Sequence, residues 1–236
     1  MKRSTESLPG LWKALNLVQD YVSSGFSRRR PELIVAGPAR AEEKTQSRQE
    51  EQRASPADDP AVIASEIASC VKCGLCTGRK TTVPGEGSLE PPVMFVGEGP
   101  GEEEDRTGRP FVGAAGRYLD KWIPAIGLRR EECFIANVVK CRPPRNREPH
   151  PEEITACLPY LQRQIRAVKP RAICCLGRIA AHTLLQTTAS LGALRGKAHT
   201  WQGIPLVVTY HPSAVLRDTS LRKPVWDDLK LLKTLL

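Results

Sequence analysis

Short apolar runs alternate with stretches of helical spacing from residue 93 onward, and this alternation constrains the fold more than any other feature. Such runs are typical of strands buried on both faces. Strand and helix in alternation imply right-handed crossovers and a mostly parallel sheet. We therefore expect an α/β three-layer sandwich with a mostly parallel four-stranded central sheet flanked by helices. The expected strands are Val93–Val96, Phe134–Val139, Ala172–Leu176 and Leu206–Thr209, with helices at about 113–126, 151–168, 177–187 and 224–236.

The amino-terminal segment, residues 1–27, contains apolar residues at helical spacing from Leu11 to Val22. This spacing predicts one amphipathic helix. The helix could dock on a protein partner or fold back on the rest of the chain, and the sequence leaves both possibilities open.

A flexible linker is expected over residues 28–60. The segment holds no aromatic residue and little apolar material, so it cannot bury enough surface to offset the entropy of ordering. The folded domain is expected over residues 61–236. Asp59 before Pro60 is typical of an N-cap followed by the first residue of a helix, and this helix would run towards Cys70.

The chain has a net charge of +9, of which residues 1–60 contribute +1 and residues 61–236 contribute +8. The basic character therefore belongs to the folded part. Nucleic acid is the obvious polyanionic partner, because phosphate contacts supply most nonspecific affinity. A charge that serves only solubility would give the same balance, so charge alone does not decide.

Eight cysteines occur in a chain that we expect to be cytoplasmic and unattached to membranes. No apolar run approaches the ~20 residues of a membrane helix, and the first residues lack the apolar segment of a signal peptide. A reducing cytoplasm disfavours disulfides, so the cysteines are expected to bind metal or pack in the core. Core packing is expected for Cys133, Cys174 and Cys175, which open or interrupt apolar strands.

The other cysteines form a candidate metal site. Cys70, Cys73 and Cys76 are spaced C-x2-C-x2-C, and Cys141 and Cys157 follow at a distance. Four thiolates can hold zinc or an iron–sulfur cluster. Zinc sites usually draw their ligands as two tight pairs, and only one tight pair is present here, which favours a cluster.

Polar groups follow the expected strands where they end, and in a parallel sheet the binding crevice lies at that edge. Gly97-Glu98-Gly99-Pro100-Gly101 follows the first strand and could bring backbone N–H groups against a ligand. Phe111, between Pro110 and a glycine-containing turn, could stack on a flat ring. An ordinary glycine turn and a core phenylalanine are the alternatives.

Asn137 ends the second strand, where its buried amide must find partners in the backbone or in a ligand. His211 follows the last strand and could donate a hydrogen bond into the same crevice. Four basic residues after Asn137 suggest that phosphates lie nearby. These residues are Lys140, Arg142, Arg145 and Arg147.

In combination these motifs closely resemble the family 4 uracil-DNA glycosylases, the iron–sulfur group of that superfamily, over about residues 66–236. The matching motifs are Gly97-Glu98-Gly99-Pro100-Gly101 with Glu102-Glu103-Glu104-Asp105, Thr107-Gly108-Arg109-Pro110-Phe111-Val112-Gly113, Asn137-Val138-Val139-Lys140-Cys141-Arg142-Pro143-Pro144, Arg195-Gly196-Lys197 and His211-Pro212-Ser213. The resemblance implies a monomeric, nucleoid-associated prokaryotic repair enzyme. It would hydrolyse the N-glycosidic bond of uracil in single- or double-stranded DNA and leave an abasic site.

The resemblance also implies a cofactor, a [4Fe–4S] cluster bound by Cys70, Cys73, Cys141 and Cys157. Cys76 occupies a position where many members lack cysteine, so it is not expected to be a ligand.

The resemblance assigns roles to the strand-end residues. The base would be rotated out of the duplex and stacked on Phe111. Asn137 would recognise the polar edge of uracil and reject cytosine, and Glu104 would crowd the C5 methyl of thymine. His211 and the backbone of Gly97, Glu98 and Gly99 would stabilise the departing anion. Gly99 stands where the best-known branch of the superfamily has a water-activating aspartate, so Glu98 or Asn146 would position the water.

Two alternatives remain open. One is a non-catalytic DNA-binding protein in which the cysteines hold zinc or a structural cluster. The other is a relative of the same superfamily that traps the sugar covalently through a histidine in an extra basic loop. Here the corresponding loop is short and His150 is the one candidate, which favours turnover.

Overall fold

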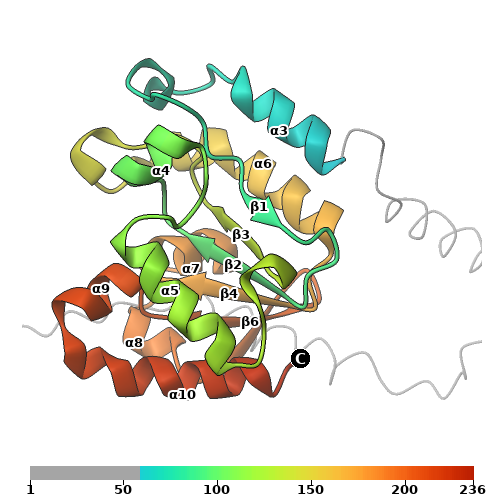
Figure 1. Cartoon of the computed structure of the whole chain (residues 1–236), viewed down its shortest axis with the longest axis vertical. Coiled ribbons are helices and arrows are strands. Elements are labelled where there is room, and N and C mark those ends of the chain that lie inside the picture. The colour runs from blue at the N-terminus through green and yellow to red at the C-terminus, as the bar shows by residue number, and fades with distance from the viewer. Residues whose placement is uncertain (1–58) are drawn as a thin grey trace, which may run out of the picture. The chain divides into compact units, whose positions relative to one another are not determined.

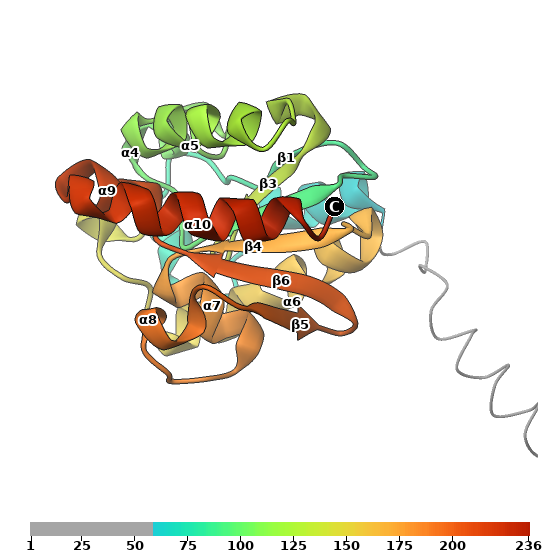
Figure 2. The same cartoon turned by 90° about the horizontal axis from the view of Figure 1, so that it is seen from below.

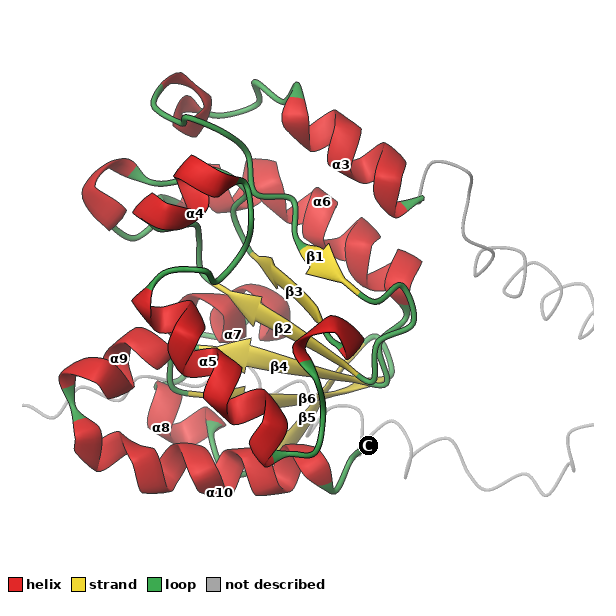
Figure 3. Cartoon of the chain, in the orientation of Figure 1, coloured by secondary structure: helices red, strands yellow, loops and turns green. Residues whose placement is uncertain are grey.

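The structure is a computed structural model that describes residues 59–236 (Figure 1). Its centre is a sheet in the strand order β1-β3-β2-β4-β6-β5, in which β3, β2, β4 and β6 pair in parallel (Figure 3). These four are the strands predicted from the apolar runs. The strands are β1 (Glu86–Gly87), β2 (Val93–Gly97), β3 (Phe134–Asn137), β4 (Ala172–Leu176), β5 (Ala198–Trp201) and β6 (Ile204–Thr209).

Two antiparallel edge strands extend the sheet beyond the expected four strands. β1 pairs with β3 and β5 pairs with β6, so the described sheet has six strands and is mixed. β1 is only two residues long, and β5 is largely solvent-accessible, so neither forms the apolar run of a buried strand. The second expected strand also ends at Asn137, two residues earlier than predicted.

Helices cover both faces of the sheet and make it the middle of three layers. Met94 and Val96 of β2 face the core shared with α3, α6, α7 and α8, whereas Val93 and Phe95 face the core shared with α5, α9 and α10 (Figure 2). This division follows from the two-residue period of a strand. The helices are α3 (Pro60–Ala68), α4 (Glu102–Thr107), α5 (Ala114–Ala125), α6 (Pro151–Val168), α7 (Arg178–Leu185), α8 (Leu191–Leu194), α9 (Pro212–Arg217) and α10 (Arg222–Lys233), with 3₁₀ turns η2 (Gly74–Thr77), η3 (Arg130–Glu132), η4 (Pro144–Asn146) and η5 (Thr219–Leu221).

The predicted helices are confirmed within the described residues. α5, α6, α7 and α10 lie where helical spacing placed them, and Asp59 caps α3 by accepting a hydrogen bond from the Ala61 N–H at 2.7 Å. The expected amino-terminal helix and all but the last two residues of the expected linker lie outside the described residues. No helix within residues 59–236 is long and apolar enough to span a membrane.

A buried ion pair fixes α10 against the end of β6. Asp228, which is 1% exposed, accepts hydrogen bonds from Arg195 Nε and Thr209 Oγ1, each at 2.7 Å, and from the Gly196 N–H at 3.1 Å. The Arg195 guanidinium lies over the ring of Tyr210, 4.3 Å from its centroid. These contacts hold the strand end that precedes His211.

Replacing Asp228 by alanine is expected to lower the free energy of unfolding by about 3 kcal/mol, because the guanidinium of Arg195, whose side chain is 13% exposed, would lose its partner. Urea denaturation measures this difference. Asp227→Ala is the matched control, since the neighbouring carboxylate is exposed and pairs with the exposed Lys223 and Lys230. Equal losses in the two variants would contradict the structural role given to Asp228.

Candidate active site

The carboxyl ends of β2, β3 and β6 meet at one edge of the sheet, where they open onto a hollow of about 400 Å³. That volume is typical of a small-molecule site. The hollow brings together residues that the sequence predicted as one site from segments more than a hundred residues apart. The predicted residues that line it are Glu98, Gly99, Glu104, Phe111, Asn137, Asn146 and His211.

Gly97 lies directly against two of the lining side chains. It pairs with Asn137 in the parallel register of β2 and β3. A Cβ atom on Gly97 would lie 2.4 Å from Asn137 Oδ1 and 2.5 Å from Phe111 Cζ, closer than atoms can approach. Only glycine at this position lets the amide and the aromatic ring lie together.

Asn137 presents an acceptor that the protein does not use. The residue is 1% exposed, and its Oδ1 is the buried side-chain N or O atom that lacks a hydrogen-bond partner within residues 59–236. Leaving a buried polar atom unpaired costs about 1–3 kcal/mol. A ligand with an N–H group could supply the missing donor.

His211 is neutral at physiological pH, with its proton on a defined nitrogen. Burial lowers the pKa of His211 to about 4. Its Nδ1 accepts a hydrogen bond from the Ser213 N–H at 3.1 Å as the N-cap of α9, so the ring proton lies on Nε2. The ring is 5.6 Å from that of Phe111 between centroids and is tilted by 36°. The site therefore combines an aromatic face with an uncharged donor.

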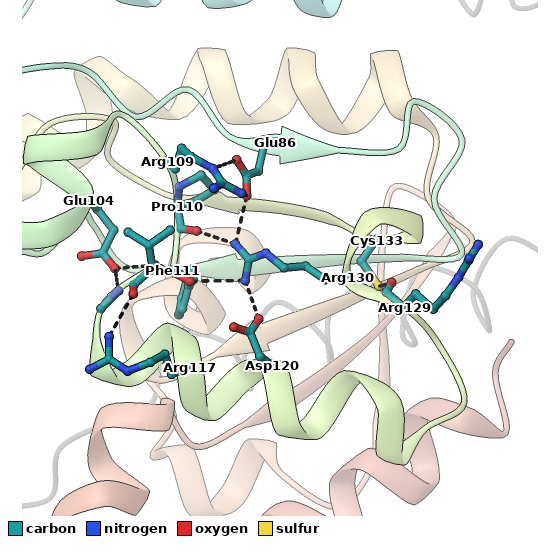
Figure 4. Close-up of polar contacts among 12 residues, drawn as sticks. Glu86, Glu104, Arg109, Pro110, Phe111, Arg117, Asp120, Arg129, Arg130 and Cys133 are labelled. Atoms are coloured by element: carbon teal, nitrogen blue, oxygen red, sulfur yellow. Dashed lines mark hydrogen bonds and ion pairs between the residues drawn. The ribbon is translucent and has the colours of Figure 1, made fainter.

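Glu104 holds two loops of the site together, a role that its place in the motif did not reveal. Its Oε1 accepts hydrogen bonds from the N–H groups of Val112 and Gly113, each at 2.8 Å (Figure 4). Its Oε2 accepts one from the Gly101 N–H at 3.1 Å. The carboxylate is thus fixed in place at the wall of the hollow.

Glu98 and Asn146, the two candidates for positioning a water molecule, differ in their surroundings. Burial and, to a lesser degree, the negative charge of Glu148 raise the pKa of Glu98 to about 6, against the opposing effect of Arg178. Asn146 is exposed, and its Oδ1 already accepts a hydrogen bond from Arg142 Nε at 2.8 Å. A half-buried carboxylate with a pKa near 6 can take a proton from water at neutral pH.

The expectation of phosphate contacts is wrong for Lys140. Its side chain is 1% exposed, and Nζ donates to the Asn137 carbonyl at 2.7 Å and to Gln164 Oε1 at 2.6 Å. Two basic residues that the sequence analysis did not single out, Arg178 and Arg217, line the hollow together with Arg147. Arg178 lies two residues after the end of β4, so its position could have indicated it, whereas Arg217 is the last residue of α9 and carries no such signal.

Of the other three basic residues of this group, Arg147 lines the hollow, whereas Arg142 and Arg145 do not. Arg147 forms a bidentate ion pair with Glu153 at 2.7 and 2.8 Å, and Arg145 is exposed. His150 is exposed at the start of α6 and is not among the lining residues of the hollow.

The candidate metal-binding cysteines lie around a second, much smaller cavity, of about 10 Å³, between the end of α3 and α6. Arg79 Nη1 donates to Cys141 Sγ at 3.3 Å and to the Cys70 carbonyl at 2.7 Å, and the Lys140 N–H donates to Cys157 Sγ at 3.3 Å. The cysteines that line this cavity are Cys70, Cys73, Cys76, Cys141 and Cys157.

The thiols of this cavity would have to lose their protons to bind a metal ion, because the thiolate is the ligand. Burial raises the pKa of Cys73 and Cys141, and it raises that of Cys157 to about 11. Within residues 59–236, no group of three or more Cys, His, Asp or Glu side chains is arranged to hold a metal ion. Cys133, Cys174 and Cys175 are fully buried in the core, as predicted.

Comparison with known proteins gives the family. Residues 84–230 match the uracil DNA glycosylase superfamily. A type-4 uracil-DNA glycosylase of Saccharolobus solfataricus is 46% identical over 185 residues, which cover 75% of this chain and 86% of the relative. One from Pyrobaculum aerophilum is 49% identical over 175 residues, covering 70% and 88%. A type-5 uracil-DNA glycosylase of the same organism is 34% identical over 184 residues, covering 64% and 81%. The chain therefore belongs to the uracil-DNA glycosylase superfamily and, within it, to the type-4 group.

Proposed function

We propose that this protein removes uracil from DNA by hydrolysing the N-glycosidic bond, which leaves an abasic site for repair. The unpaired Oδ1 of Asn137, next to the Phe111 ring and the His211 donor, carries the proposal. The names of the type-4 relatives, uracil-DNA glycosylases, support it.

Recognition of the base follows from the hydrogen-bonding pattern of uracil. The base leaves the stack, which costs least at a mismatch, and its face lies on the ring of Phe111. Asn137 Oδ1 accepts from N3–H, and the amide nitrogen donates to O4. Cytosine presents the reverse pattern and would leave two buried groups unpaired, at about 1–3 kcal/mol each. The fixed carboxylate of Glu104 excludes the methyl group of thymine.

Bond cleavage places negative charge on the departing uracil and positive charge on the sugar. The neutral His211 donates from Nε2 to O2 as that charge develops, and backbone N–H groups of the turn at Gly97, Glu98 and Gly99 add to the stabilisation. Donors held in place before the reaction need no reorganisation, so each is worth about 3–4 kcal/mol. The phosphates of the DNA help to balance the sugar cation.

Glu98 is our preferred residue for positioning the water molecule. Above its pKa of about 6 the carboxylate accepts a hydrogen bond from the water and takes its proton as the water attacks the sugar. Asn146 is the weaker candidate, because its side-chain oxygen is already bonded to Arg142.

Cys70, Cys73, Cys141 and Cys157 would hold a [4Fe–4S] cluster. Four thiols around one cavity, with N–H groups from Arg79 and Lys140 directed at two sulfurs, fit the donor set of such a group. When bound, the cluster supplies a cross-link between the end of α3, the loop after β3 and α6. Cys76 lies at the same cavity and would remain a free thiol.

The partner of the site is uracil-containing DNA, single- or double-stranded. The protein is further proposed to act as a cytoplasmic monomer. Residues 61–236 would form the catalytic domain, residues 28–60 a linker, and residues 1–27 a segment that contacts a partner protein. The exposed position of His150, away from the lining of the hollow, favours turnover over covalent trapping.

Asn137→Asp is expected to lose uracil selectivity. A carboxylate can accept from N3–H but cannot donate to O4, so uracil release falls by at least tenfold, or a protonated form releases cytosine. Deoxyuridine and deoxycytidine oligonucleotides, treated with alkali after incubation, measure both activities by strand cleavage. Unchanged rate and unchanged selectivity would contradict the role of Asn137, and a wild-type protein without strand cleavage on deoxyuridine would contradict the proposed function.

The rate of uracil release is expected to fall as pH decreases through about 6. Glu98 has a raised pKa and is active in its charged form, so activity is present above that pKa and is lost below it. His211 remains neutral down to about pH 4 and does not add to this loss. The measurement is kcat/KM from pH 5 to pH 8 for the wild type and Glu98→Gln. Glu98→Gln should have a low kcat/KM that does not fall further below pH 6. The control Glu152→Gln, at an exposed residue, should show the same pH dependence as the wild type.

Cys157→Ser is expected to lose the cluster, and Cys76→Ser is expected to retain it. Iron and acid-labile sulfide are measured per chain, together with the visible absorbance of freshly purified protein. The two variants form a matched pair because both cysteines line the same cavity. Iron retained in Cys157→Ser at wild-type content, or lost from Cys76→Ser, would contradict the ligand assignment.

A further inference from the structure

Phe111 holds its ring in the site through an unusual backbone conformation. Its φ is +53°, in the left-handed region that bulky side chains rarely adopt. Such a conformation persists only where the surrounding structure imposes it, and it is concentrated at functional sites. The contacts around Phe111 therefore determine where the stacking face lies.

Arg130 of η3 donates hydrogen bonds to the backbone carbonyl groups of Phe111 and of the residue before it. Its Nη2 donates to the Pro110 carbonyl at 2.7 Å, and its Nη1 donates to the Phe111 carbonyl at 3.2 Å (Figure 4). Gly116 leaves room for the turn, because a Cβ there would lie 1.9 Å from the Phe111 oxygen. Arg130 is thus a side chain whose charge is directed at the carbonyl groups of the turn.

The Arg130 guanidinium is itself held by hydrogen bonds to two carboxylates, which come from different elements. Asp120 of α5 accepts from Nη1 at 2.7 Å, and Glu86 of β1 accepts from Nη2 at 3.1 Å. The other oxygen of Glu86 accepts from Arg109 Nε at 2.8 Å. Only a planar group with several fixed donors can satisfy two carbonyls and two carboxylates at once, so lysine cannot replace it.

We propose that Arg130 is a positioning residue for base recognition, which acts by holding Phe111 in the conformation that receives the flipped base. This inference rests on the proposed function, since it concerns the same hollow. Arg130 contacts neither the hollow nor the base, and its effect passes through the Phe111 backbone. Without the guanidinium, the turn relaxes and the ring leaves its place beside Gly97 and His211.

The test compares Arg130→Met, Phe111→Ala and the double variant. We expect Arg130→Met to lower kcat/KM for uracil release on the order of 10- to 100-fold, as a displacement of about 1 Å near the reacting group does. The double variant should lose no more than Phe111→Ala alone, because both changes remove the same stacking face. Arg129→Met is the control, since Arg129 is an exposed neighbour paired with Glu131 and Glu132, and it should retain wild-type activity.

Binding provides a second readout that a loss of stability alone would not change. The probe is an oligonucleotide with 2′-fluoro-2′-deoxyuridine, whose fluorine disfavours the sugar cation and slows cleavage. Arg130→Met and Phe111→Ala should weaken binding of this probe by similar factors and leave binding of the matching thymidine oligonucleotide unchanged. Asp120→Asn, which keeps Arg130 but weakens its support, should give a smaller loss in the same direction and serves if Arg130→Met fails to fold.

Full additivity in the double variant would overturn the inference, as would Arg130→Met or Asp120→Asn variants with wild-type probe binding and activity. These results differ from a failure of the proposed function, in which the wild type itself releases no uracil.

Discussion

The parallel register of β2 with β3 is the constraint on which the site depends. It places Gly97 opposite Asn137, and the missing side chain of Gly97 lets the amide and the Phe111 ring occupy adjacent positions. Because side chains alternate along a strand, a shift of one residue would turn Asn137 to the other face of the sheet. The base-reading group is therefore fixed by backbone pairing rather than by a flexible loop.

The loops around that edge are held by charged side chains that bind backbone groups. Glu104 accepts from three N–H groups in two loops, and Asp228 joins α10 to the strand end before His211. Both carboxylates are buried, so their hydrogen bonds are shielded from water. Such bracing keeps donors and acceptors in place before the substrate arrives, which is the condition for strong electrostatic stabilisation.

Local sequence patterns predicted the features that depend on local causes. Buried strands need apolar runs, so the four central strands were found, whereas β1 and β5 are edge strands without that requirement. Asn137 and His211 were found because Asn137 is the last residue of its strand and His211 lies two residues after the end of β6. The burial of Lys140 was not predicted, because nothing in the adjacent sequence shows that its side chain turns inward to Gln164. Arg130 was missed for a similar reason, since Glu86 lies 44 residues away.

The unpaired oxygen of Asn137 lowers the stability of the folded protein, but it provides an acceptor for a bound base. An apolar residue of the same shape would remove the free-energy cost of leaving this oxygen unpaired in the folded protein. A bound base that donates an N–H to this oxygen removes that cost, so binding of the base also stabilises the fold. Evolution towards heat resistance alone would discard this asparagine, and only continued encounters with damaged DNA would retain it.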